Sequence, residues 1–263
     1  MQRASIGTVG PTVFARVSLT FLCIIFRYAR EGAMGQGGDD VLLNRRAAAE
    51  FSGGISSDLI YNAIQHVITD RDLRGKLLDY GAGVGQLTRR LLSLQRFERI
   101  SAADILPAPP DLIAKVEWIG QDLNLPLLNH DENFDVVIAA EVIEHLENPR
   151  AMMRDLYRVL RPGGTVIIST PNNESWRAIL ALLIRGHYVA FGDTNYPAHI
   201  VALLRKDLDR IFRETRFHPA EFQYTNEGGL PGKPDVTWQA VTFGFLRGLR
   251  FTDNLIAVAT KPR

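Results

Sequence analysis

Short apolar runs alternate with amphipathic segments from about residue 56 to residue 170. The run FDVVIAA (134–140) is apolar almost throughout, which is typical of a parallel strand buried on both faces. Further strands are expected at KLLDY (76–80), RISAADI (99–105), AKVEWIG (114–120) and TVIIST (165–170), with helices at 56–68 and 148–160 between them. Such alternation predicts an α/β fold with a doubly wound, parallel sheet.

The glycine cluster in LLDYGAGVGQ follows the first predicted strand. Gly81, Gly83 and Gly85 would let the backbone turn sharply and approach a ligand closely. A dinucleotide fingerprint requires Gly-x-Gly-x-x-Gly, whereas here the residue two after Gly83 is already Gly85. Asp79 would repel a pyrophosphate but would suit an ammonium group. A dinucleotide-dependent oxidoreductase is therefore disfavoured.

Two more acidic residues follow the next two strands. Asp104 ends the second strand, where a carboxylate can bind both hydroxyls of a ribose. Asp122, in GQDLNLPL, follows the third strand and could accept a hydrogen bond from an adenine amino group. Either residue alone could be a solvated surface carboxylate. Together with Asp79 and the glycines, they indicate a nucleoside-type ligand at the carboxyl edge of the sheet.

The stretch EVIEH (141–145) follows the fourth strand directly. If the chain becomes helical after Ala140, then Glu141, Glu144 and His145 share one helix face. Two carboxylates and an imidazole suit Mg²⁺ or Mn²⁺ better than zinc. The alternative is that no metal binds and that a histidine serves as a general base. Both interpretations stay open at this point.

The order of these motifs resembles the class I S-adenosylmethionine-dependent methyltransferases over roughly residues 56–263. It is most similar to the O-methyltransferases of ubiquinone biosynthesis, and the EVIEH pattern also resembles small-RNA 2′-O-methyltransferases. The resemblance implies a Rossmann-like, seven-stranded sheet, mostly parallel, with the last strand antiparallel. Both subgroups carry a further histidine downstream, for which His199 is the candidate here and His187 a weaker one.

The resemblance also implies roles for individual residues. Asp79 and the glycine turn would hold the methionine end of the cofactor, Asp104 with Ile105 the ribose, and Asp122 with Leu123 the adenine. Backbone at Glu141 would border the methyl sulfonium. The cofactor-binding set is Asp79, Gly81, Ala82, Gly83, Gly85, Asp104, Ile105, Asp122, Leu123 and Glu141; the catalytic candidates are His145 and His199; the metal candidates are Glu141, Glu144, His145 and His199.

The expected function is methylation of a hydroxyl on a small molecule, with Mg²⁺ or Mn²⁺ as a possible second cofactor. A quinone precursor, a secondary metabolite or a sugar would fit. Alternatives are N- or C-methylation without metal, an RNA 2′-O-methyltransferase-like enzyme, and a non-catalytic nucleotide-binding module. Nucleic acid is disfavoured because 30 basic residues face 29 acidic ones and no basic patch is visible.

We expect an N-terminal extension at 1–40 and a methyltransferase domain at 41–263, with lid insertions near 171–204 and 226–250. The apolar stretch 17–26 is shorter than the about 20 residues that span a bilayer, so no membrane span is expected. Deletion of residues 1–33 should leave cofactor binding intact. The single cysteine, Cys23, excludes an internal disulfide and favours a reducing compartment, hence a cytoplasmic location.

Overall fold

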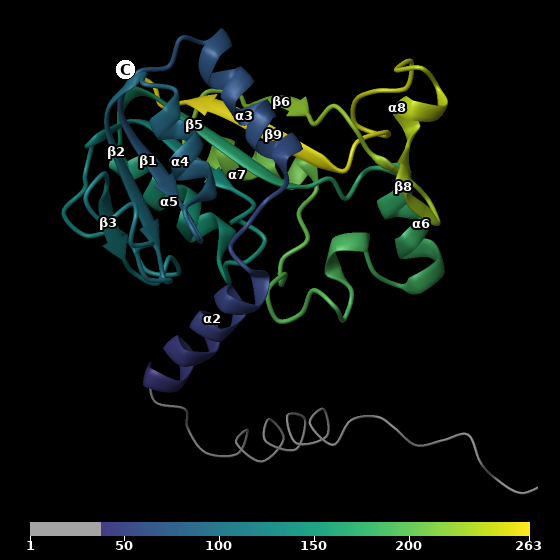
Figure 1. Ribbon diagram of the computed structural model, residues 1–263, viewed down its shortest axis with the longest axis horizontal. Coiled ribbons are helices and arrows are strands. Elements are labelled where there is room, and N and C mark those ends of the chain that lie inside the picture. The colour runs from purple at the N-terminus through teal and green to yellow at the C-terminus, as the bar shows by residue number, and fades with distance from the viewer. Residues whose placement is uncertain (1–37) are drawn as a thin grey trace, which may run out of the picture. The chain divides into compact units, whose positions relative to one another are not determined.

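The computed structural model describes residues 38–263, and the expectations for residues 1–33 and 17–26 lie outside this part. Leu42–Arg263 forms one compact unit, which contains every strand of the described residues (Figure 1). Within the described residues, no helix has both the length and the apolar character needed to cross a bilayer.

Seven strands form the main sheet in the order β3-β2-β1-β4-β5-β9-β6 (Figure 1). Strands β1 to β5 pair in parallel, and β9 is antiparallel to both β5 and β6. The strands are β1 (Gly75–Tyr80), β2 (Phe97–Asp104), β3 (Glu117–Gly120), β4 (Phe134–Ala140), β5 (Leu160–Pro171), β6 (Glu221–Tyr224) and β9 (Asn254–Thr260). The expected seven-stranded, mostly parallel sheet with an antiparallel last strand is confirmed.

Helices cover both faces of this sheet, and each face has its own buried cluster. Ile64 of α3 and Leu91 of α4 pack with Ile138 on one side. Leu156 of α5 and Phe212 of α7 pack with Val137 on the other. The remaining elements are α2 (Gly38–Ser52), α3 (Asp58–Asp70), α4 (Gln86–Ser93), α5 (Pro149–Val159), α6 (Trp176–Arg185), η1 (Val189–Phe191), α7 (Arg205–Glu214), β7 (Gly229–Leu230), β8 (Lys233–Thr237) and α8 (Trp238–Val241).

The strand order reverses at β1: β2 and β3 follow on one side of it, and β4 and β5 follow on the other. In open α/β sheets a ligand crevice forms outside the carboxyl ends of the strands at such a switch point. The glycine turn after β1 and the EVIEH stretch after β4 both begin there. The topology therefore brings the two main sequence motifs to one place.

The glycine turn requires glycine for two reasons. Gly81, Gly83 and Gly85 have φ angles of 82°, 55° and 77°, in the left-handed region that side chains disfavour. A Cβ on Gly83 would also lie only 2.3 Å from the carbonyl oxygen of Gly54. The segment before α3 therefore packs directly on the turn, and the Val84 amide donates to the Gly54 carbonyl.

We expect Gly83→Ala to lower the free energy of unfolding by about 2 kcal/mol or more, because the backbone of residue 54 would have to move. Denaturant unfolding measures this change. Gly120→Ala is the matched control, since a Cβ there meets nothing within 4 Å. Equal stability of the two variants would show that the close approach of Gly54 is unimportant.

Candidate active site

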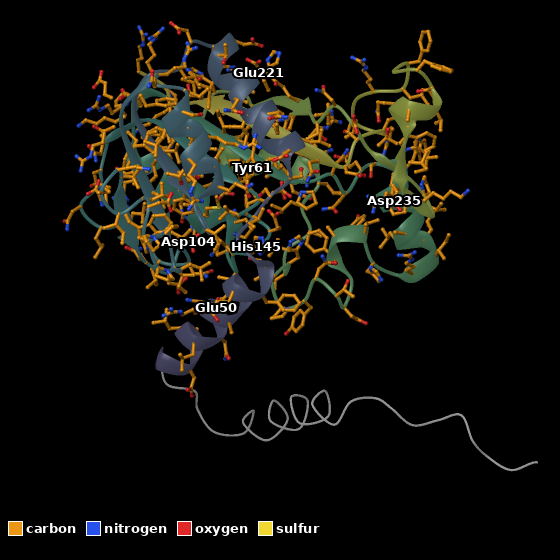
Figure 2. The ribbon with its side chains drawn as sticks, viewed as in Figure 1. Glu50, Tyr61, Asp104, His145, Glu221 and Asp235 are labelled. Carbon is orange, nitrogen blue, oxygen red and sulfur yellow. The ribbon has the colours of Figure 1, made fainter. Side chains whose placement is uncertain are left out.

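Asp104 supports the glycine turn with its carboxylate. Its Oδ2 accepts from the Gly83 amide at 2.7 Å and its Oδ1 from the Leu106 amide at 2.8 Å. The side chain is buried, and burial raises the pKa of Asp104 above its usual value. Ile105 follows it, half-buried. Asp104 and His145 lie toward the same side of the unit (Figure 2).

Asp79 lies at the end of β1, buried below the turn. Its Oδ2 accepts a hydrogen bond of 2.6 Å from the hydroxyl of Thr88 on α4, a partner that the sequence did not reveal. Burial raises the pKa of Asp79 to about 7. A cationic group placed against it would lower that pKa again, so this carboxyl group is suited to an ammonium ligand.

Asp122 has partners on both carboxylate oxygens. Oδ1 accepts from the backbone and side-chain amides of Asn124, both at 3.0 Å. Oδ2 accepts from Nη1 of Arg45 at 2.6 Å. Arg45 belongs to α2, and it also donates to both carboxylate oxygens of Glu147, at 3.0 and 2.8 Å. Leu123, beside Asp122, is buried.

Arg45 therefore connects the loop after β3 with the end of the EVIEH loop. The Glu147 amide adds a second connection, because it donates to the side-chain oxygen of Asn124 at 2.9 Å. Arg45 is not predictable from the sequence. Nothing in the local pattern of residues 38–52 distinguishes it from the adjacent Arg46, whose ion pair among the residues that the structure describes is with Glu50 on the same helix.

The helical arrangement expected for EVIEH is wrong. Glu141 has a φ of 55°, residues 141–147 form turns, and α5 begins only at Pro149. The Glu141 amide instead donates to Ser169 of the neighbouring strand, to its carbonyl at 3.2 Å and its hydroxyl at 3.0 Å. This left-handed residue bends the chain away from β4, so spacing along a helix does not explain the geometry of the site.

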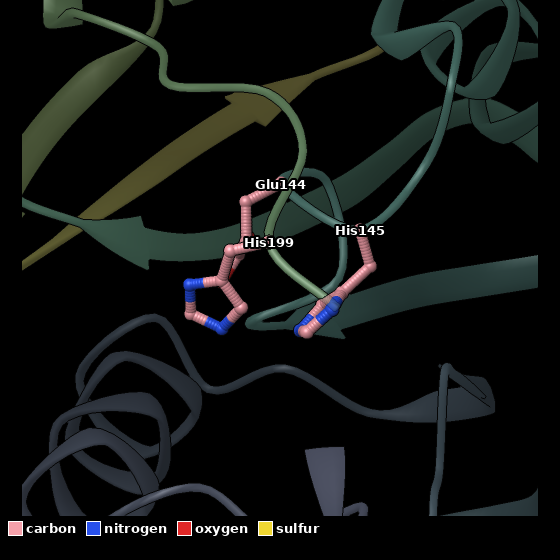
Figure 3. Close-up of side chains that lie close together, drawn as sticks. All are labelled: Glu144, His145 and His199. Carbon is pink, nitrogen blue, oxygen red and sulfur yellow. The ribbon is translucent and has the colours of Figure 1, made fainter. Parts of the chain in front are cut away.

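Glu144, His145 and His199 come together nevertheless (Figure 3). One potential ligand atom from each lies within 4.8 Å of the others. The His145 and His199 rings meet edge to face, with centroids 4.7 Å apart. The amides of Ile200 and Val201 donate to the Glu144 carbonyl at 2.9 and 3.1 Å, which fixes the downstream segment against EVIEH.

Hydrogen bonds orient the three groups. Nδ1 of His145 lies 2.9 Å from the carbonyl oxygen of Ala198, which can only accept, so Nδ1 carries the proton and Nε2 keeps a lone pair. Burial, together with the neighbouring His199, lowers the pKa of His145 to about 4, so the ring is neutral. Oε2 of the buried Glu144 accepts from the Thr170 hydroxyl at 3.1 Å.

Several buried polar atoms at this place have no partner among the described residues. They include Oε1 of Glu144, Nδ1 of His199 and Oε1 of Glu141. Burial of a polar atom without a hydrogen bond is costly and rare, so these atoms are available to bind a ligand or water. A carboxylate and two neutral imidazoles form a donor set that fits a divalent cation.

Glu141 lies beside this cluster without belonging to it. Its Oε2 accepts from the Asn254 side chain on β9 at 3.0 Å, another contact that the sequence did not predict. Burial raises the pKa of Glu141 to about 7, and burial with the charge of Glu141 raises that of Glu144. His187 lies outside the cluster, with Nδ1 near the Tyr188 carbonyl.

A family model described as a methyltransferase domain matches residues 55–219. The chain belongs to the class I S-adenosylmethionine-dependent methyltransferases. The family predicted from the order of the motifs is thus confirmed. The match covers the glycine turn, the acidic residues after β2 and β3, the EVIEH loop and His199.

Curated relatives match part of the chain at moderate identity. The ubiquinone biosynthesis O-methyltransferase of Pseudomonas entomophila is 31% identical over 123 residues, 43% of this chain and 51% of that protein. The malonyl-[acyl-carrier protein] O-methyltransferase of Hahella chejuensis is 34% identical over 101 residues, 36% of either chain. The chain thus spans about half the length of the ubiquinone relative.

Solved structures share the fold of this methyltransferase. A SAM-dependent methyltransferase from Archaeoglobus fulgidus superposes with a TM-score of 0.54 at 19% identity, covering 81% of this chain and 97% of that one. The 1,6-didemethyltoxoflavin-N1-methyltransferase of Burkholderia thailandensis, solved with its acceptor and S-adenosylhomocysteine, has a TM-score of 0.53 at 15% identity, covering 96% and 94%.

Proposed function

We propose that this methyltransferase transfers a methyl group from S-adenosylmethionine to a hydroxyl oxygen of a small molecule, assisted by Mg²⁺ or Mn²⁺ at Glu144, His145 and His199. The observation that carries the proposal is the gathering of these three donor groups, two with unpartnered buried atoms, at the carboxyl edge of β4 beside the glycine turn. The O-methyltransferase relatives favour oxygen as the acceptor atom.

The cofactor would lie along the carboxyl edge of the sheet. We assign its amino group to Asp79, its ribose to Asp104 with Ile105, and its adenine to Asp122 with Leu123. The turn of Gly81, Ala82, Gly83 and Gly85 would approach it with backbone, and Glu141 would border the methyl group.

S-Adenosylmethionine supplies a methyl group that is already activated, so the protein has to orient the acceptor and handle its proton. A cation, when bound, lowers the pKa of a hydroxyl placed against it. The hydrogen bond between His145 and the Ala198 carbonyl fixes the orientation of the imidazole. The hydrogen bond from the Thr170 hydroxyl fixes the orientation of the Glu144 carboxyl group. Without a cation, the neutral rings of His145 and His199 would accept the proton of the hydroxyl themselves.

Thermal unfolding and methyl transfer together test this function. S-Adenosylhomocysteine should raise the melting temperature by mass action, and NAD should not. With methyl-labelled S-adenosylmethionine, a soluble catechol should be methylated in the presence of Mn²⁺ and much more slowly with a chelator, whereas an aromatic amine should not react. A melting temperature raised by NAD but not by S-adenosylhomocysteine would contradict S-adenosylmethionine as the cofactor. Methylation of the amine independent of metal would favour N-methylation instead.

Cofactor affinity should fall below about pH 7. The pKa of Asp79 is raised to about 7 without ligand, and only its ionised form attracts an ammonium group. Affinity for S-adenosylhomocysteine should therefore be level above that pH and decline by about tenfold per pH unit below it. Calorimetry between pH 5.5 and 8 measures this. In Asp79→Asn the affinity should be low and nearly independent of pH; an unchanged pH profile would remove Asp79 from the ammonium site.

Arg45→Ala should weaken S-adenosylhomocysteine binding by about five- to tenfold, because charge-assisted hydrogen bonds fix the Asp122 carboxylate. Arg46→Ala is the matched control on the next position of α2, since within the described residues Arg46 forms its ion pair with Glu50 on the same helix. Titration calorimetry at a single pH compares the affinities of the two variants for S-adenosylhomocysteine. Equal affinities in the two variants would show that Arg45 does not position the adenine site.

We also propose that the protein is located in the cytoplasm. The single cysteine, which excludes an internal disulfide and favours a reducing compartment, is the ground for a cytoplasmic location. Localisation of a tagged full-length chain by fractionation tests it, and recovery in an oxidising compartment would contradict it.

A further inference from the structure

Two consecutive asparagines follow β5 and precede α6. Asn172 and Asn173 are 2% and 3% exposed, although asparagine is usually a surface residue. A buried amide side chain needs hydrogen-bond partners. Both side chains find them in backbone carbonyls of segments far along the chain. The end of β5 is thus a point at which distant segments are attached to the sheet.

Asn172 holds the connection between α8 and β9. Its Nδ2 donates to the Leu249 carbonyl at 2.6 Å and to the Thr252 carbonyl at 2.8 Å. Its Oδ1 accepts from the Glu174 amide at 3.1 Å. This connection contributes no side chain to the cluster shown in Figure 3.

Asn173 holds the segment that carries His199. Its Nδ2 donates to the carbonyl of Leu203 at 3.0 Å, and Leu203 is itself buried. Residues 199–204 form neither helix nor strand, so no regular backbone hydrogen bonds define their path. Attachment to fixed parts of the fold has to define it instead. Asn173, directly after an interior strand of the sheet, provides one such attachment.

A second attachment of this segment is the EVIEH loop. The amides of Ile200 and Val201 donate to the Glu144 carbonyl at 2.9 and 3.1 Å. Glu144 follows β4 and Asn173 follows β5, and because these strands pair in parallel, both attachments start from the same edge of the sheet. Ile200 and Leu203 are only three positions apart, so together the two attachments fix both the position and the direction of the segment.

We propose that Asn173 is a positioning residue for His199. The proposal rests on the proposed function, in which His199 completes the divalent cation site. Partners behind a metal ligand hold that ligand in place, and their loss typically lowers metal affinity or activity by about 10- to 100-fold. Asn173 acts in this way through the backbone. Without its hydrogen bond, the segment loses the attachment after β5, and the imidazole of His199 is free to leave the cluster.

Asn172 provides the control for a purely structural role. It is the same residue type, equally buried, and its side chain makes more hydrogen bonds within the described residues than that of Asn173. Leucine at either position keeps the approximate shape of asparagine but removes the N–H donor. Asn172→Leu should therefore destabilise the protein at least as much as Asn173→Leu, whereas only Asn173→Leu should disturb His199. Serine, which is too short to reach the carbonyls, gives a second and smaller substitution at both positions.

Amide hydrogen exchange of the full chain without metal tests the attachment itself. Asn173→Leu should speed exchange of the Ile200 and Val201 amides by at least about tenfold, since their segment opens more often. Asn172→Leu should leave these two amides unchanged. It should instead speed exchange of the Trp176 amide, which donates to a carbonyl of the connection between α8 and β9 at 3.0 Å.

A Mn²⁺ titration followed by electron paramagnetic resonance, with S-adenosylhomocysteine present, tests the consequence for the cluster. Asn173→Leu should raise the dissociation constant for Mn²⁺ by at least about tenfold, and Asn172→Leu by less than about twofold. Affinity for S-adenosylhomocysteine should be alike in the wild type and both variants, because neither asparagine has a hydrogen bond to the glycine turn in the described part of the chain.

Two outcomes would overturn the proposal. They are unchanged exchange of the Ile200 and Val201 amides in Asn173→Leu, and equal Mn²⁺ affinities of the two variants when the wild type binds the ion. Absence of Mn²⁺ binding in the wild type would instead contradict the metal site of the proposed function. The exchange rates and single-turnover methyl transfer, which should slow in Asn173→Leu alone, would then decide the role of Asn173 without the metal.

Discussion

Asp104→Ala is expected to weaken binding of S-adenosylhomocysteine by at least about 100-fold. A carboxylate that accepts from two ribose hydroxyls makes two charge-assisted hydrogen bonds, each worth about 1.5–3 kcal/mol. The buried carboxylate also holds the Gly83 and Leu106 amides, so its removal loosens the turn on which the cofactor would lie. Calorimetry measures the affinity, and circular dichroism verifies that the fold persists.

A coupling experiment separates the ribose contact from support of the turn. The wild type should bind the 2′-deoxy analogue of S-adenosylhomocysteine more weakly than the parent compound, whereas Asp104→Ala should bind both alike. Equal discrimination by both proteins would mean that Asp104 supports only the glycine turn. Unchanged affinity in Asp104→Ala would remove the residue from the cofactor site altogether.

His199→Ala is expected to slow methyl transfer to a hydroxyl acceptor by about 10²- to 10⁴-fold, the range typical of a lost general base or metal ligand. Cofactor affinity should stay within about twofold, because His199 contacts the Glu144 and His145 side of the site rather than the glycine turn. Single-turnover kinetics with methyl-labelled S-adenosylmethionine measures the rate of methyl transfer. His187→Ala is the control, since that histidine lies in the same segment between β5 and α7 but outside the cluster. Equal rates in both variants would contradict a catalytic role for His199.

Continuous apolar runs made the central strands predictable. FDVVIAA matches β4 residue for residue, because every position after Asp135 is apolar and buried, as expected for a strand covered on both faces. The third strand was predicted three residues too long: β3 starts at Glu117, since residues 111–115 form turns that hydrogen-bond locally. The buried Val116 precedes the strand and continues its apolar pattern, so the pattern does not locate the start.

The EVIEH stretch shows that the spacing of residues along the chain does not by itself predict the local backbone structure. Three groups at i, i+3 and i+4 suggested a helix face, but the left-handed conformation of Glu141 excludes a helix there. The cluster forms because backbone bonds from Ile200 and Val201 to Glu144 bring a distant segment to the turn. The motif indicated which groups would meet, while only the tertiary contacts determine how.

Supporting residues of the site were not predictable from the sequence. Arg45 lies 77 positions from Asp122, and Asn254 lies 113 positions from Glu141. Each has an ordinary neighbourhood in the chain. Asn254 reaches Glu141 because the sheet order places β9 beside β5, whereas Arg45 reaches Asp122 from α2, which lies outside the sheet. Thr170 was likewise not predictable as a supporting residue. Its hydroxyl on β5 donates a hydrogen bond to Glu144, in the loop that follows the neighbouring strand β4.

The claim that a divalent cation binds beside the cofactor site is tested most directly by electron paramagnetic resonance. Mn²⁺ would be titrated into the wild type, His199→Ala and His187→Ala, each with S-adenosylhomocysteine present. We predict one saturable Mn²⁺ site in the wild type and in His187→Ala, and loss of that site in His199→Ala. Absence of binding in the wild type, or equal binding in all three proteins, would contradict the metal site and leave Glu144, His145 and His199 to act on the acceptor without a cation.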